Sequence, residues 1–137
     1  MKHIEETRRI IAECFQLTLS LDTFGEDTTG LLHVELVSDD FSAKVIMDVY
    51  VNNYEHFLSE MQNMYRTLRG EATIKELYGN KQALKFRMDD YGHVYVEGAL
   101  ASQGHNGHDQ YIYIENDFDQ TSLSDFDYSD QLEMSDL

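Results

Sequence analysis

The sequence predicts an α+β fold, an antiparallel meander β-sheet of about six to seven strands packed against one main helix, with short N- and C-terminal helical segments. Several short segments alternate strictly between apolar and polar residues, which is the pattern of a strand with one buried face. One longer segment repeats its apolar residues at helical spacing instead. The connections between alternating segments are short, so neighbouring strands are expected to pair antiparallel.

Length and composition fit one domain over residues 1–137, with about residues 130–137 expected as a frayed acidic tail. The chain is 42% hydrophobic, which argues against global disorder despite the high charge. Its single cysteine, Cys14, cannot form an internal disulfide, which favours a reducing compartment. The first residues resemble neither a signal peptide nor a membrane span, so a cytoplasmic location is expected.

The charge is strongly negative and unevenly distributed. Ten Lys and Arg residues stand against 26 Asp and Glu residues, and residues 88–137 contain 12 acidic residues and no basic ones. Nucleic acid and anionic membranes would be repelled, which leaves no nucleic acid and no membrane among the expected partners. A basic protein partner would be attracted. The simpler alternative is that the acidity only keeps the chain in solution.

The first third of the chain predicts one short helix and three strands. Residues 3–13 contain good helix formers, with Ile4, Ile11 and Phe15 at helical spacing. The segment "CFQLTLSLD" then alternates, and "LLHVELVS" and "AKVIMDVYV" continue the pattern. The predicted core positions on these strands are Phe15, Leu17, Leu19, Leu21, Leu32, Val34, Leu36, Val45, Met47, Val49 and Val51.

Residues 53–69 predict the main helix. An apolar stripe marks the face toward the sheet, and its members are Phe57, Leu58, Met61, Met64, Tyr65 and Leu68. Asn52 and Glu55 have the spacing of a capping box at the start. Gly70 suits the position just after the helix, where a left-handed backbone is common.

The second half predicts three or four further strands. "EATIKELYGN" fits either a short strand or an irregular segment, whereas "ALKFRMDD", "VYVEGALAS" and "QYIYIEN" alternate clearly. Gly92 lies in a tight turn that favours positive φ. Gly98, inside a strand, indicates a bulge or a close neighbour.

Chemistry-bearing motifs are weak. His105, His108 and Asp109 lie together in a glycine-containing loop, but a metal site needs three or four ligands of fixed geometry. We therefore interpret the loop as a polar hairpin connection, with a metal site as the alternative. Cys14 beside Phe15 fits a small buried residue better than a nucleophile. No nucleotide-binding or nucleophile motif is present, so neither a cofactor nor an enzyme is predicted.

The face opposite the core is more informative. Tyr95, Tyr111 and Tyr113 should project from adjacent strands, interleaved with Glu97 and Glu115. Tyrosine is enriched at protein interfaces, so this face predicts a partner-binding surface. The acidic residues that follow extend it, and they are Asp117, Asp119, Asp125 and Asp127. The alternatives are cross-strand tyrosine pairing that only stabilises the sheet and an interaction module that forms a homodimer through the tyrosines.

The stretch "GHVYVEGALAS" followed by "YIYIENDFDQTSLSDF" resembles the end of the WapI-like family of bacterial immunity proteins. The resemblance extends over residues 15–126 and includes the strand and helix "VYVNNYEHFLSEMQNMYRTLRG". It implies a protein without catalytic activity that neutralises a toxin, often a nuclease domain, by direct binding in the cytoplasm. No binding residue is implied by the resemblance itself.

The C-terminal segment departs from that family pattern. Asp127, Ser129 and Asp130 interrupt the apolar periodicity of the last helical element. We expect Thr121 or Asp119 to cap a short helix. The apolar side chains expected to dock it are Phe118, Leu123 and Phe126.

Overall fold

The computed structural model describes residues 3–24, 28–79, 81–104 and 106–126. These residues form β-strands, one α-helix and one short 3-10 helix. In chain order the elements are β1 (His3–Ile11), β2 (Phe15–Phe24), β3 (Thr29–Ser38), β4 (Phe41–Tyr50), α1 (Val51–Thr67), β5 (Glu71–Lys75), β6 (Ala83–Met88), β7 (His93–Gln103), β8 (Asp109–Asp119) and η1 (Gln120–Leu123).

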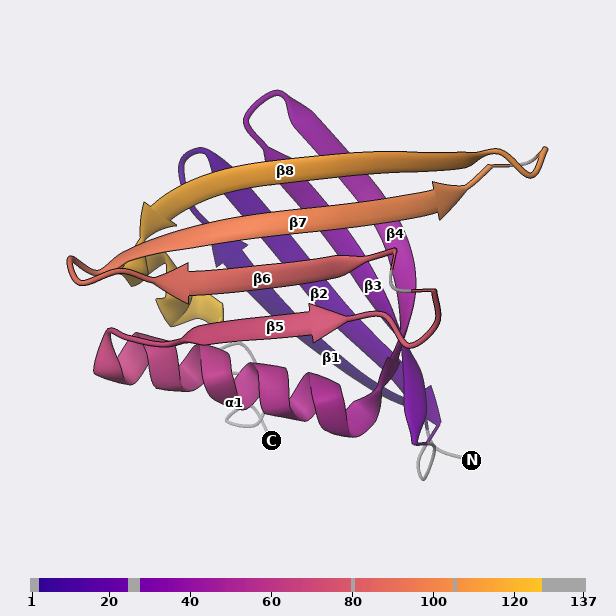
Figure 1. The fold of residues 1–137 in the computed structure, drawn as a ribbon. Helices are drawn as coiled ribbons and strands as arrows, with labels where there is room; N and C mark the ends of the chain where they lie inside the picture. Colours follow the sequence, from indigo (N-terminus) through magenta and orange to yellow (C-terminus); the bar gives the residue numbers. More distant parts are fainter. Residues whose placement is uncertain (1–2, 25–27, 80, 105, 127–137) are drawn as a thin grey trace.

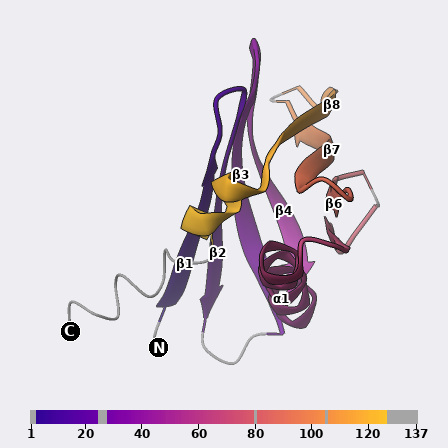
Figure 2. The same cartoon turned by 90° about the vertical axis from the view of Figure 1, so that its left-hand side faces the viewer.

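The strands form two sheets, so the prediction of one sheet with six to seven strands was wrong. Each sheet is a four-stranded antiparallel meander, with the orders β1-β2-β3-β4 and β5-β6-β7-β8. The helix is the physical cause of the division. It follows β4 directly and packs against β5, so the chain returns in a second layer rather than beside β4. Figures 1 and 2 show the first sheet as one layer, and the second sheet with α1 beside it as the other.

The core lies between these two layers. Alternate residues on the inner faces of both sheets are buried together with one stripe of α1. The predicted faces of β2 and β3 are confirmed, as are Met47 and Val49 on β4. The largest side chains with almost no exposed surface are Tyr54, Phe15, Phe57 and Phe86.

The predicted helix over residues 3–13 was wrong, because this segment is strand β1. It pairs antiparallel with β2 from His3 opposite Phe24 to Ile11 opposite Gln16. Ile10 is fully buried on the core face. Pairing along a whole neighbouring strand outweighs the modest helix preference of the segment.

Helix α1 is present, but its ends differ from those predicted. It starts at Val51 after Tyr50, with no side-chain capping bond, so the capping box was wrong. At the other end Leu68, not Gly70, follows the helix with a left-handed backbone, and its N–H donates to the carbonyl of Met64 at 2.9 Å. Gly70 still adopts positive φ two residues later.

The docking of the C-terminal segment is confirmed as far as it is described. Phe118, Leu123 and Phe126 are buried, and the Asp119 side chain accepts from the Thr121 N–H at the start of η1. Phe118 stacks on Phe15 with ring centroids 5.5 Å apart. Asp127 and the predicted frayed residues 130–137 lie outside the described residues.

Two glycine predictions are also confirmed. Gly92 has φ of 78° in the turn between β6 and β7. Gly98 has a close neighbour, because an added Cβ would lie 3.0 Å from the Leu84 side chain and 3.2 Å from that of Ile114. Gly98 therefore lets three strands pack tightly at the centre of the second sheet.

Candidate partner-binding face

The outer face of the second sheet brings six of the predicted site residues together. Strand register places Tyr95 opposite Asp117 and Glu97 opposite Glu115. Tyr113 and Tyr111 lie opposite Ala99 and Ala101 on the neighbouring strand. Because residues two apart on a strand share a face, these side chains form one continuous surface over β7 and β8.

The two tyrosines on β8 are open to solvent. Tyr111 is 64% exposed and Tyr113 is 62% exposed. The Tyr111 hydroxyl donates to Asp109 at 3.3 Å, and the Tyr113 hydroxyl donates to Glu115 at 3.0 Å. The bond to Glu115 raises the pKa of Tyr113. Each ring is thus held along its own strand by a carboxylate, with its apolar surface exposed.

Basic residues of β6 border this surface, and they were not included in the predicted site. Lys85 lies opposite Glu97, and Arg87 lies opposite Tyr95 with its guanidinium carbon 4.9 Å from the ring centroid. The alternation in "ALKFRMDD" had already placed both side chains on the outer face. The face is therefore polarised, with positive charge at β6 and negative charge at β8.

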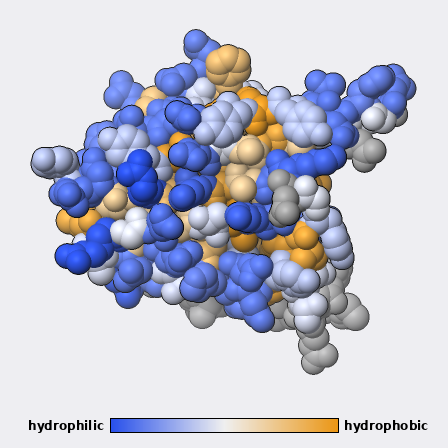
Figure 3. Space-filling model, viewed as in Figure 1, coloured by the Kyte–Doolittle hydropathy of each residue, from blue (hydrophilic) through white to orange (hydrophobic). Residues whose placement is uncertain are grey.

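Figure 3 shows this face as largely hydrophilic, with narrow apolar areas between the polar side chains. Ala83 and Ala99 are cross-strand neighbours on it, and Ala101 continues along β7. Because the side chains beside Tyr111 and Tyr113 are small, the two tyrosine rings project from the surface of the sheet.

Two of the remaining predicted site residues lie at the end of this surface or past it. Asp119 ends β8 and caps η1, and the hydrogen bonds from Thr121 lower the pKa of its carboxyl. Asp125 is exposed in the helical turn after η1, a segment that contacts α1 and β1. Asp127 lies outside the described residues.

The loop before β8 contains the predicted metal alternative. His105 lies outside the described residues, whereas His108 and Asp109 are exposed. Asp109 forms an ion pair with Lys81 at 3.0 Å, and this hydrogen bond lowers the pKa of Asp109 and raises that of Lys81. Among the described residues, no group of three or more His, Cys, Asp or Glu side chains is arranged to hold a metal ion.

Near its other end, β8 is attached to the first sheet through Asn116. The Asn116 amide nitrogen donates to the Cys14 carbonyl at 3.1 Å and to the Ser38 hydroxyl at 2.9 Å. The Cys14 thiol donates to the Asn116 side-chain oxygen at 3.3 Å. Cys14 is half-buried rather than buried as predicted, because it lies at the margin of the two layers and bonds to β8.

The outer face of the first sheet has a different character. A shallow cavity across β1 to β4 is lined by hydroxyl side chains and by residues of both charges, including Arg9, Glu35 and Lys44. Lys44 and Glu35 form an ion pair at 3.3 Å. The charges on this face largely neutralise one another, so it offers less attraction to a charged partner.

Comparison with known proteins finds one family. The family model described as Immunity protein WapI-like family matches residues 12–132. Neither the curated proteins nor the solved structures contain a match. Across the part of the chain that the structure describes, no helix has the length and apolar character needed to cross a membrane.

Proposed function

Because the chain belongs to the WapI-like family of immunity proteins, we propose that it neutralises a cognate toxin by binding it with the tyrosine- and carboxylate-bearing surface over β7 and β8. The family accounts for toxin neutralisation in general. The choice of surface rests on one observation, which is the row of exposed tyrosines and acidic residues along β8.

A basic toxin domain fits this surface best. Tyr111 and Tyr113 offer rigid, exposed rings, and Glu115 and Asp117 lie on the same strand face. Lysine and arginine side chains of a partner could stack on the rings and pair with the carboxylates. A nuclease domain has such a basic surface, because it must bind phosphates. Covering that surface would block its substrate without any catalysis by the immunity protein.

The test uses this protein as bait in an extract of its native host, with washes at low and then high salt. We expect one basic protein to be retained in stoichiometric amount and released as salt screens the attraction. That protein is then expressed alone and together with the bait. Growth arrest by the partner and rescue by the bait are the expected results.

Two outcomes would contradict the proposal. A captured partner that does not inhibit growth would remove the immunity function for this chain. A toxin whose affinity is the same at low and high salt would leave neutralisation intact but exclude the electrostatic surface. Sedimentation of the protein alone at high concentration tests the homodimer alternative, because a dimer lost in Tyr111→Ala would assign the tyrosines to self-association.

A further inference from the structure

We infer that the partner of this protein binds as an added β-strand along the free edge of β8, over residues 109–115, with apolar and basic residues alternating along that strand. The inference rests on the proposed function for the basic character of the partner. The edge itself, and the groove beside it, are features of the fold alone.

Among the strands that the structure describes, β8 is the terminal one of its sheet. Its backbone N–H and C=O groups point away from β7 at odd-numbered positions. The Asp117 N–H donates to the Asn116 side chain and the Asp117 carbonyl accepts from Cys14, so both groups point away from β7. The register with β7 is unbroken from Asp109 to Asp119. Tyr111, Tyr113 and Glu115 therefore direct their N–H and C=O groups toward the open edge as well.

The other sheet edges are better covered. Helix α1 packs along β5. The carbonyls of Ile46 and Asp48 on β4 accept from the Gln82 side chain and the Leu77 N–H. The C-terminal segment lies against part of β1, where η1 contacts the strand and the Arg8 side chain donates to the Phe126 carbonyl at 3.1 Å. Long exposed edges readily pair with another strand, so the open stretch of β8 is a binding feature of the backbone.

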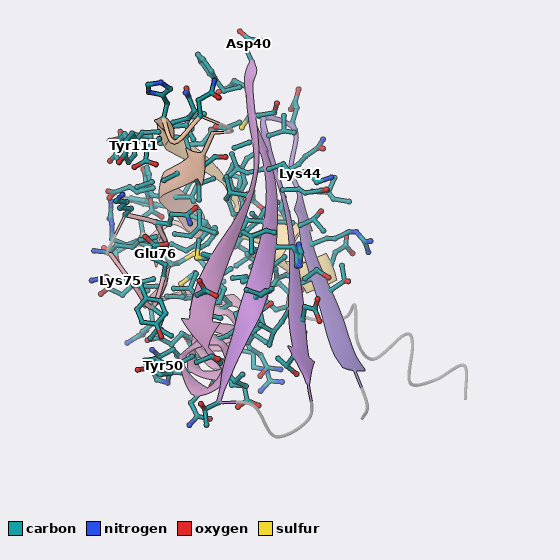
Figure 4. All side chains as sticks on the ribbon, turned by 90° about the vertical axis from the view of Figure 1, so that its right-hand side faces the viewer. Asp40, Lys44, Tyr50, Lys75, Glu76 and Tyr111 are labelled. Carbon is teal, nitrogen blue, oxygen red and sulfur yellow. The ribbon has the colours of Figure 1, made fainter. Side chains whose placement is uncertain are left out.

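A groove beside this edge offers a place for the inner face of an added strand. It lies between β4 and the β7–β8 hairpin, and its lining includes Ala43, Val45, Leu100 and Ile112. The turn between β3 and β4 extends beyond β8 in Figure 1, and Figure 4 shows Asp40 at its tip and Tyr111 on the opposite layer.

Phe41 marks the same uncovered region. It lies at an odd-numbered position of β4, as do the core residues Met47 and Val49, yet it is 65% exposed. The second sheet does not extend far enough to cover it. An added strand beside β8 would extend that sheet over this inner face, so apolar residues at every second position would be buried there.

The β8 side chains next to the outer face of the added strand determine which charge that strand should carry. Side chains directly opposite across an antiparallel pair have Cβ atoms about 5 Å apart. Outward residues of the new strand would therefore lie beside Tyr111, Tyr113 and Glu115, where lysine or arginine is favoured. A second copy of β8 fits less well, because pairing centred on Tyr113 would place Asp109 opposite Asp117.

The probe is a short synthetic peptide in which valine alternates with lysine or arginine, and a scrambled peptide of the same composition is its control. Hydrogen exchange read by NMR should show that the alternating peptide protects the amides of Tyr111, Tyr113 and Glu115. Protection of Ser42 and Lys44 instead would place the strand on β4 and overturn the inference. Equal protection by the scrambled peptide, or none by either, would overturn it too.

Two substitutions at Tyr113 distinguish the contribution of the backbone N–H to peptide binding from that of the side chain. Tyr113→Ala removes only the ring, whereas Tyr113→Pro also removes the outward N–H, and proline is tolerated at such an edge position. We expect Tyr113→Pro to bind the peptide about tenfold more weakly than Tyr113→Ala, because the proline variant loses one backbone hydrogen bond to the peptide. Equal affinities would contradict strand addition. If Tyr113→Pro does not fold, the exchange pattern of the unaltered protein still decides.

The same measurement with the captured toxin distinguishes the two proposals. Toxin binding that protects the three β8 amides supports both of them. Toxin binding that protects other amides and leaves these three unchanged overturns strand addition but not neutralisation. If the peptide protects the edge while no toxin is neutralised, the edge binds a strand and the proposed immunity function is wrong.

Discussion

Within β8, residues 116–119 are held by several parts of the fold, whereas the outer edge of residues 109–115 meets no further strand among those that the structure describes. The first half pairs with β7 and exposes Tyr111 and Tyr113. The second half inserts Phe118 against Phe15 and bonds through Asn116 to the first sheet. One continuous strand thus has an attached end that joins the two layers and an open end available to a partner.

The register with β7 is the same along the whole of β8, so it does not explain why one end is attached to the first sheet and the other is open. Inner positions are apolar along most of the strand, from Ile112 to Phe118, and outer positions are polar or tyrosine. The contrast comes from the first sheet, because Cys14 at the end of its β1–β2 hairpin bonds to Asn116 and to the Asp117 carbonyl. Substitutions in the two halves should therefore separate stability from binding.

The largest expected effect is on the attached end. Phe118→Ala removes a buried ring that stacks on Phe15, and we expect a loss of about 3–5 kcal/mol in the free energy of unfolding. Tyr111→Ala removes an equally large but exposed ring and should change that free energy by less than about 1 kcal/mol. Urea unfolding monitored by circular dichroism measures both. Similar losses for the two variants would abolish the distinction between the halves.

A smaller loss is expected at Asn116. Asn116→Asp keeps the shape of the side chain but replaces its two N–H donors by an acceptor that faces the Cys14 carbonyl and the Asp39 carboxylate. Leaving such acceptors without a donor typically costs about 1–3 kcal/mol. Urea unfolding should show this loss, and Asn106→Asp in the exposed hairpin loop is the matched control. Equal stability of the two variants would mean that Asn116 does not join the layers.

Much of this fold was predictable, because alternation is a local property of the chain. The inner and outer positions of β2, β3, β6, β7 and β8 follow directly from it, including the shared face of Tyr95 and Tyr113. β1 was missed because its alternation is weak and because residues such as Glu5 and Glu6 are good helix formers. The division into two sheets depends on the direction in which α1 leads the chain away from β4. No local sequence pattern predicts that direction.

The candidate site was predictable only in part for a related reason. Register, unlike alternation, depends on pairing, so the sequence could not place Arg87 beside Tyr95 or Lys81 beside Asp109. The open edge of β8 is a property of the sheet order. Phe41, next along β4 from the residues that line the groove, lies at the same alternating positions as Met47 and Val49 but is exposed.

On the open end, binding rather than stability should respond to charge. Glu115→Gln keeps the acceptor for the Tyr113 hydroxyl but removes the negative charge. We expect association with the captured toxin to become several-fold slower at low salt, with little change at high salt. Surface plasmon resonance measures the rates. The control is Glu71→Gln, which removes an equal charge from β5 at the far edge of the same sheet. If Glu71→Gln slows association equally, the net charge of the protein, and not the β8 surface, attracts the toxin.

The smallest expected effect lies at the end of the attached half, where Asp119 caps η1. Hydrogen bonds from the Thr121 hydroxyl and N–H hold the pKa of Asp119 below its ordinary value of 3.8. Because this pKa is lower in the folded state, ionised Asp119 stabilises the fold above its unfolded-state pKa. That contribution is lost as the pH falls through the folded-state pKa.

Asp119→Asn keeps a side-chain acceptor for the cap but cannot titrate. Its thermal midpoint should lie slightly below that of the unaltered protein near neutral pH, and the two should converge in acid, below about pH 4. Asp125→Asn removes a charge from the next turn without touching the cap, so its difference from the unaltered protein should not show this convergence. If both variants follow the same pH dependence, net charge rather than the cap at Asp119 governs the acid response of the attached end.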